Sequence, residues 1–105
     1  MKLAFLGAGN MAGAMIQSIL AADVLKGDEI LLVNARNPAH GKETAARLGI
    51  TAAEPAALRT ADAIVFAMKP QDFSAASAMY RSYLENQLVL SIMAGISFKK
   101  LEKEL

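Results

Sequence analysis

The sequence predicts an α/β fold, a doubly wound parallel sheet covered by helices on both faces and therefore built in three layers. Short apolar segments alternate with segments of helical periodicity along the 105 residues, which is the pattern of repeated strand–helix units. The apolar segments are continuous in hydrophobic character, as expected for parallel strands buried on both faces. A glycine pair, Gly7 and Gly9, stands where the first apolar segment gives way to the first helical one.

Five apolar segments are expected to form the strands. The first, Lys2–Leu6, is followed by Glu29–Asn34, Ile50–Ala52, Ala63–Met68 and Gln87–Ile92. Because parallel strands are joined by right-handed crossovers, we expect the order 3-2-1-4-5 across the sheet.

Helices are expected between the strands. The predicted segments are Asn10–Ala22, Gly41–Leu48 after a loop at Ala35–Ala39, Glu54–Thr60 and Gln71–Leu84. Gly49 is expected to end the second helix, and Pro55 to lie in the first turn of the third. Apolar spacing predicts the buried faces: Met11, Met15, Ile19 and Ala22 in the first helix, and Phe73, Ala76, Tyr80, Tyr83 and Leu84 in the fourth. A last helix is expected to begin at Ser97.

Composition narrows the class of protein. The net charge of +1 gives no reason to expect a nucleic-acid partner. The absence of cysteine excludes disulfides and thiolate metal sites and fits a reducing cytoplasm. No apolar run approaches the roughly 18 residues of a membrane span, so we expect neither a membrane partner nor a secretion signal.

The glycine motif predicts a dinucleotide site in a Rossmann-type domain. Gly7 would permit a tight turn, Gly9 would let a pyrophosphate approach the backbone, and Ala12 would let the helix pack closely on the strand. The free N–H groups of the helix would then face the phosphates. The predicted contacts are Leu6, Gly7, Ala8, Gly9, Asn10 and Met11. The alternative is an ordinary structural turn.

The end of the second strand favours NADP(H) over NAD(H). NAD sites usually carry an acidic residue there, whereas this chain has Asn34, Arg36 and Asn37. Arg36 can pair with a 2′-phosphate through a forked contact, so removing it should weaken NADPH binding far more than NADH binding. The alternative is a solvated surface arginine, with NAD(H) as a possible second coenzyme.

Two further stretches are expected on the same rim of the sheet. Ala67, Met68, Lys69 and Pro70 follow the fourth strand at the topological switch point, where ligands bind. Pro70 holds the backbone of Lys69 extended, although Lys69 could also be a merely solvated side chain. Ile92, Met93 and Ala94 end the fifth strand.

No catalytic or metal-binding residue is predicted. His40 is expected to be a surface histidine in a loop, and Asp62 a turn residue. The chain shows no Ser-His-Asp arrangement, paired carboxylates or metal-ligand spacing. The sequence therefore predicts a coenzyme-binding unit without acid–base machinery.

Three motifs together resemble the amino-terminal half of the pyrroline-5-carboxylate reductase family. They are Gly7-Ala8-Gly9-Asn10-Met11, Ala67-Met68-Lys69-Pro70-Gln71 and Ser91-Ile92-Met93-Ala94-Gly95-Ile96-Ser97, followed by Leu101-Glu102 and Leu105. The resemblance implies reduction of 1-pyrroline-5-carboxylate to proline with NAD(P)H. It also implies that the first motif holds the pyrophosphate, Asn34 to Asn37 the adenosine 2′ side, Ala67–Pro70 the nicotinamide ribose and Ile92–Ala94 the nicotinamide end.

The chain departs from that family at two positions and in length. The family usually has valine where Met68 stands, and often asparagine, reaching the ribose, where Glu54 stands. Its members also carry a helical carboxyl-terminal domain that dimerises and forms the substrate pocket, which we expect to be absent here. The resemblance therefore implies an NADP(H)-binding domain that is inactive alone, and a homo-oligomer for the longer family member.

Two other functions stay open. One is the coenzyme domain of another NADP-dependent oxidoreductase, of the hydroxyacid-dehydrogenase or deazaflavin-dependent type, which shares the glycine motif and the fold. The other is a non-catalytic nucleotide-binding module.

Overall fold

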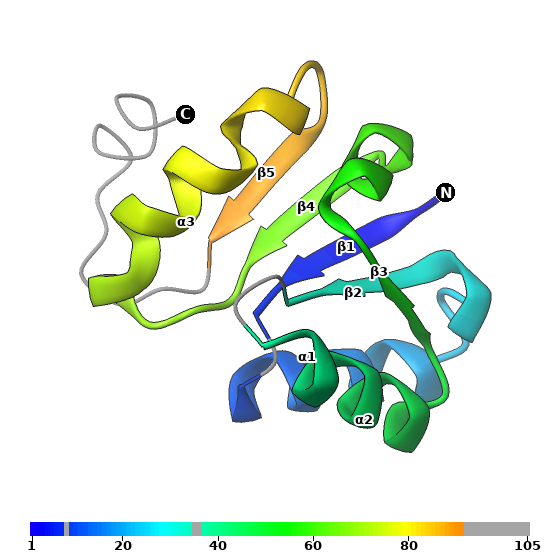
Figure 1. The fold of residues 1–105 in the computed structure, drawn as a ribbon. Helices are drawn as coiled ribbons and strands as arrows, with labels where there is room; N and C mark the ends of the chain where they lie inside the picture. The colour runs from blue at the N-terminus through cyan, green and yellow to red at the C-terminus, as the bar shows by residue number, and fades with distance from the viewer. Residues whose placement is uncertain (8, 35–36, 92–105) are drawn as a thin grey trace.

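Five parallel strands form one sheet at the centre of the computed structural model, which describes residues 1–7, 9–34 and 37–91 (Figure 1). In chain order the strands are β1 (Leu3–Leu6), β2 (Ile30–Val33), β3 (Thr51–Ala53), β4 (Ala63–Phe66) and β5 (Leu88–Ser91). They lie in the order β3-β2-β1-β4-β5, so the predicted topology is confirmed. In this register Leu6, the last residue of β1, stands between Val33 of β2 and Phe66 of β4.

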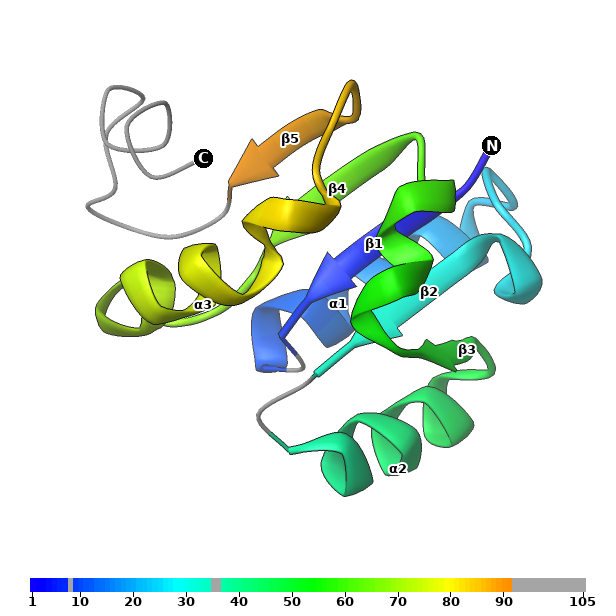
Figure 2. The ribbon, with the colours of Figure 1, turned by 45° about the horizontal axis from the view of Figure 1, so that its top comes forward.

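Helices cover both faces of the sheet and complete the three layers. On one face lie α1 (Asn10–Ala21) and α2 (Pro38–Leu48), and on the other lie α3 (Phe73–Tyr80) and the 3-10 helix η2 (Pro55–Thr60), as the turned view makes plain (Figure 2). Three shorter 3-10 turns complete the described elements: η1 (Gly27–Glu29), η3 (Pro70–Asp72) and η4 (Arg81–Tyr83). No helix in the described part of the chain has the length and apolar character needed to cross a membrane.

Alternate residues along the strands pack into two separate hydrophobic cores, one on each face of the sheet. Leu3 and Phe5 pack with α1 and α2, whereas Ala4 and Leu6 pack with η2 and α3. All four residues of β1 are buried, which is why the segment is apolar without alternation. Burying such a run on both sides gives each large side chain about 1.5–3 kcal/mol of hydrophobic stabilisation.

The buried face of α1 differs from the predicted one. Ala12 and Ile16 are fully buried, Met15 and Ile19 are partly buried, and Ala22 is exposed. The helix is turned so that the small Ala12 contacts the sheet, which moves the centre of the apolar face from Met15 to Ile16. The core role expected of Met15 is confirmed in part.

The predicted helix Gln71–Leu84 is divided into η3, α3 and η4. Pro70 has no N–H and begins a 3-10 turn in which Asp72 N donates to Lys69 O at 2.9 Å. The buried residues of α3 include Ser77, whose hydroxyl donates to Phe73 O at 2.8 Å. Apolar periodicity does not identify it because serine is polar, and its burial is tolerated because the hydroxyl is hydrogen-bonded within its own helix.

The other helix boundaries follow from local capping. α2 begins at Pro38, three residues earlier than predicted, because the Asn37 side chain accepts a hydrogen bond from His40 N at 3.2 Å and Pro38 fits the first helical position. Gly49 ends this helix with φ 76°, as predicted. β3 starts one residue later than predicted, and the segment after Glu54 is a 3-10 helix.

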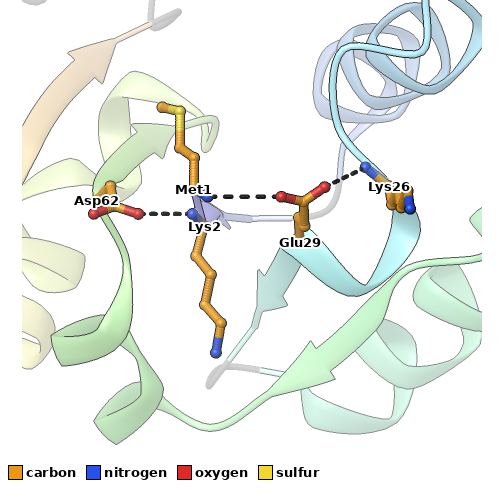
Figure 3. Close-up of polar contacts among 5 residues, drawn as sticks. All are labelled: Met1, Lys2, Lys26, Glu29 and Asp62. Atoms are coloured by element: carbon orange, nitrogen blue, oxygen red, sulfur yellow. Dashed lines mark hydrogen bonds and ion pairs between the residues drawn. The ribbon is translucent and has the colours of Figure 1, made fainter.

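Polar contacts hold the amino ends of the strands together (Figure 3). Lys2 N donates to Asp62 Oδ2 at 2.7 Å, which ties the start of β1 to the start of β4. The Met1 ammonium lies 3.6 Å from Glu29 Oε2, and Glu29 Oε1 accepts a hydrogen bond from Lys26 N at 2.9 Å. Asp62 therefore has a structural role, at the edge of the sheet opposite the strand ends where ligands bind.

Candidate coenzyme site

A cleft of about 660 Å³ lies at the carboxyl ends of the central strands. We call it the larger cleft. Its walls come from the turn after β1, the end of β2, the start of α2, the end of β4 and α3. The lining residues are Gly7, Gly9, Asn34, His40, Ala67, Met68, Lys69, Asp72, Ala75, Ala76, Met79 and Tyr80. Six of these were not predicted as site residues, chiefly those of the α3 wall.

Gly7 is required by the protein itself. Its φ is 100°, a value that favours glycine, and a Cβ built there would stand 3.1 Å from Ala67 O. Gly7 N donates to Val33 O at 3.2 Å, and Ala67 N donates to Leu6 O at 2.9 Å. The turn after β1 is thus held against the ends of both neighbouring strands.

Gly9 is not required by the protein. Its backbone is extended, with φ −80° and ψ −179°, and a Cβ built there would have no heavy atom within 4 Å. It is the N-cap of α1, where no side chain caps the helix and no acidic residue lies in the first turn. The open space above Gly9 therefore faces N–H groups that can bind an anion.

Asn34 and Asn37 connect β2 to α2. Asn34 Oδ1 accepts a hydrogen bond from Asn37 N at 3.2 Å, and Asn37 Oδ1 accepts one from His40 N. A Cβ on the buried Gly41 would lie 3.0 Å from Asn34 Cβ, so the helix comes close to the strand end. Asn34 and His40 line the larger cleft. Asn37 does not line it, but its backbone N–H and side chain make the hydrogen bonds that connect the other two residues.

The end of β4 forms the next part of the lining. Ala67 is buried, Met68 is partly buried and Lys69 is exposed. Leu6, which was predicted as a contact, is fully buried in the core and offers only its backbone. Asn10 and Met11 begin α1, and Pro70 begins η3. Five predicted contacts lie outside the described residues: Ala8, Arg36, Ile92, Met93 and Ala94.

A second cleft, of about 480 Å³, lies beside the first, between α2 and the end of β3. We call it the smaller cleft. Its lining includes Lys42 and Glu54, and it shares Asn34 with the larger cleft. Glu54 is exposed and sits at the N-cap of η2.

The described residues offer no metal site. No group of three or more His, Cys, Asp or Glu gathers within residues 1–7, 9–34 and 37–91. The single histidine is exposed as predicted, but it lies on α2 and not in a loop. The geometry is that of a cleft that can hold a phosphate-containing ligand over the end of a parallel sheet.

Curated proteins with similar sequences are pyrroline-5-carboxylate reductases. Pyrroline-5-carboxylate reductase 1 of Bacillus spizizenii is 34% identical over 107 aligned positions, which cover 99% of this chain and 36% of that protein. The Staphylococcus haemolyticus enzyme is 35% identical, over 100% of this chain and 40% of that protein. The chain thus spans less than half the length of these relatives.

Solved structures agree with the predicted fold. Pyrroline carboxylate reductase of Plasmodium falciparum, solved with NADP bound, matches with a TM-score of 0.80 at 24% identity and covers 99% of this chain and 37% of that one. The Coxiella burnetii pyrroline-5-carboxylate reductase matches with a TM-score of 0.81 at 25% identity, over 99% and 39% of the two chains. The domain is therefore of the Rossmann type.

A family model decides the membership of the chain. The model described as "NADP oxidoreductase coenzyme F420-dependent" matches residues 2–95, which is most of the sequence. With the fold and the glycine turn already described, this chain belongs to that family of NADP-dependent oxidoreductases.

Proposed function

We propose that the chain binds NADP(H) in the larger cleft, with the coenzyme pyrophosphate above Gly9 and the amino end of α1. Gly9 carries the proposal, because neither its backbone angles nor its packing calls for glycine. A ligand that comes close to the backbone supplies the missing reason. The family and the NADP-bound relative support the choice of coenzyme.

The test is Gly9→Ala. A methyl group there meets no protein atom but enters the space assigned to the pyrophosphate. We expect the Kd for NADPH to rise by about tenfold or more, equivalent to about 1.4 kcal/mol, while the loss of a glycine N-cap lowers the unfolding temperature only slightly. Fluorescence titration with NADPH measures the change.

Gly13→Ala is the matched control. Gly13 lies one turn further along α1, also has open space where a Cβ would stand, and does not line the larger cleft. This variant should bind NADPH as tightly as the parent chain. Equal affinities for the parent and Gly9→Ala would show that the pyrophosphate does not lie above Gly9.

We further propose that this domain serves the reduction of 1-pyrroline-5-carboxylate to L-proline. The support is the 33–36% identity to curated enzymes of that name along the whole chain. The substrate pocket would come from a part corresponding to the remainder of these relatives, of which the chain spans 36–40%. A cytoplasmic location and assembly into a homo-oligomer belong to the same proposal.

Two assays test the reductase proposal. The 105-residue chain should bind NADPH without oxidising it when 1-pyrroline-5-carboxylate is added. The longest protein encoded by the same gene should form proline, followed by the loss of NADPH absorbance and by chromatography. Oxidation of NADPH with a deazaflavin but not with the pyrroline would instead favour the other branch of the family.

A further inference from the structure

We propose that His40 contacts the phosphate on the 2′ position of bound NADP(H) and thereby directs the adenosine end of the coenzyme into the larger cleft. The inference rests on the proposed coenzyme function and adds a residue that sets coenzyme preference. It also assigns a role to a histidine whose sequence context predicted none.

The position of His40 is fixed by the end of β2. Asn34 accepts from Asn37 N, and Asn37 in turn accepts from His40 N, with both distances 3.2 Å. These two bonds place His40 in the first turn of α2 at the rim of the larger cleft. Its side chain is exposed, so it can meet a ligand without any rearrangement of the core.

The adenosine ribose of a bound coenzyme is expected at the end of β2, close to His40. In dinucleotide-binding folds the adenosine ribose lies at the end of the second strand, and the residue there contacts its 2′ position. Asn34 is the described residue at that place, and it lines both clefts. From Asn34 the 2′-phosphate can therefore turn toward His40 in the larger cleft or toward Lys42 in the smaller one.

Continuity with the proposed pyrophosphate position favours the larger cleft, since each of the two clefts is lined by one lysine and one acidic residue. In the smaller cleft Lys42 is accompanied by the Glu54 carboxylate, which repels a phosphate. In the larger cleft the charged lining residues are Lys69 and Asp72, which lie between β4 and α3, whereas His40 lies on α2. That cleft also contains Gly7 and Gly9, so one continuous space serves both phosphate positions.

Few other ionisable groups share the larger cleft with His40. Lys69, Asp72 and Tyr80 line the same cleft, and the same helix carries Lys42 and Glu43. Lys42 lines the smaller cleft instead, so it is the matched comparison for His40.

His40→Gln and Lys42→Gln form the decisive pair. Both residues are exposed on α2, and each change removes one basic group beside a different cleft. We expect His40→Gln to weaken NADPH binding by about two- to fivefold, the size of an exposed polar contact. NADH, which lacks the 2′-phosphate, should bind equally to the parent and to both variants.

Isothermal titration calorimetry measures the affinities of the parent and both variants for NADPH and for NADH. Unchanged unfolding temperatures confirm that both variants fold normally.

The outcomes separate the two proposals. If the parent binds NADPH but His40→Gln binds it equally well, the His40 inference fails and the coenzyme function stands. A selective loss in Lys42→Gln would place the phosphate in the smaller cleft and also overturn the inference. If the parent does not bind NADPH, the proposed function fails, and the inference with it.

Discussion

The two glycines of one short turn are glycine for different reasons. Gly7 has a φ of 100° and packs against Ala67, so the fold itself needs it. Gly9 has ordinary angles and open space, so the packing does not require glycine there, and we propose that the coenzyme does. The sequence motif predicts both positions, but only coordinates separate a structural requirement from a functional one.

Replacing Gly7 by alanine tests the structural requirement. The strained φ and the 3.1 Å approach to Ala67 O should lower the free energy of unfolding by about 1–3 kcal/mol. Thermal unfolding should then shift down by roughly 4–8 °C per kcal/mol for a domain of this size. Gly13→Ala should instead stabilise the helix by about 0.5–1 kcal/mol. An unchanged unfolding temperature for Gly7→Ala would refute the assignment.

At the scale of elements, the sequence predicts every described strand and its place in the sheet, while helix boundaries are less accessible. The apolar strands are recognisable because both faces are buried. The start of α2 depends on the Asn37 cap, and the division around α3 depends on Pro70, so both are set by individual hydrogen bonds. The α3 wall of the larger cleft was missed because Ala75, Ala76 and Met79 look like ordinary helix residues until the helix is positioned.

The 3-10 turn before β2 makes stability depend on pH. The hydrogen bond from the Lys26 backbone, aided by the Met1 ammonium, lowers the pKa of Glu29 below its ordinary 4.5 (Figure 3). A lowered folded pKa contributes stability above the ordinary value, and this contribution is lost as the pH falls through the folded value. Glu29→Gln should therefore lower the urea midpoint at pH 7 and flatten its decline below pH 4.5.

Asp28→Asn is the matched control, since Asp28 is an exposed acidic residue of the same turn. It should leave the decline of the urea midpoint below pH 4.5 as steep as in the parent. If Glu29→Gln also leaves it unchanged, the Lys26–Glu29 contact does not contribute to the acid sensitivity of the fold.

At the scale of the whole molecule, coenzyme and fold should be coupled. The larger cleft is built from segments of β1, β2, β4, α2 and α3 that come together only in the folded chain. NADPH at 100 times its Kd should then raise the free energy of unfolding by about 2.7 kcal/mol. Urea unfolding with NADPH and with the same concentration of NADH measures this, and equal stabilisation by both would contradict the preference for the 2′-phosphate.

On one side of the edge strand β5, the described helices leave two leucines exposed. Leu88 and Leu90 of β5 are 60% and 44% exposed, and their register partners Ala63 and Val65 belong to the core beneath α1 and α2. The sequence predicts the strand but not this exposure, because periodicity reports the character of a segment and not what covers it.

The central place of β1 has a consequence for how the protein is made. β1 is synthesised first, yet both strands that flank it, β2 and β4, come later, and β4 ends only at Phe66. At about 5–20 residues per second, the roughly 60 residues between β1 and the end of β4 take about 3–12 s to appear. During that interval the wholly apolar segment Leu3–Leu6 cannot pair with β4. We therefore expect nascent chains to depend on chaperones more than the stability of the finished domain suggests.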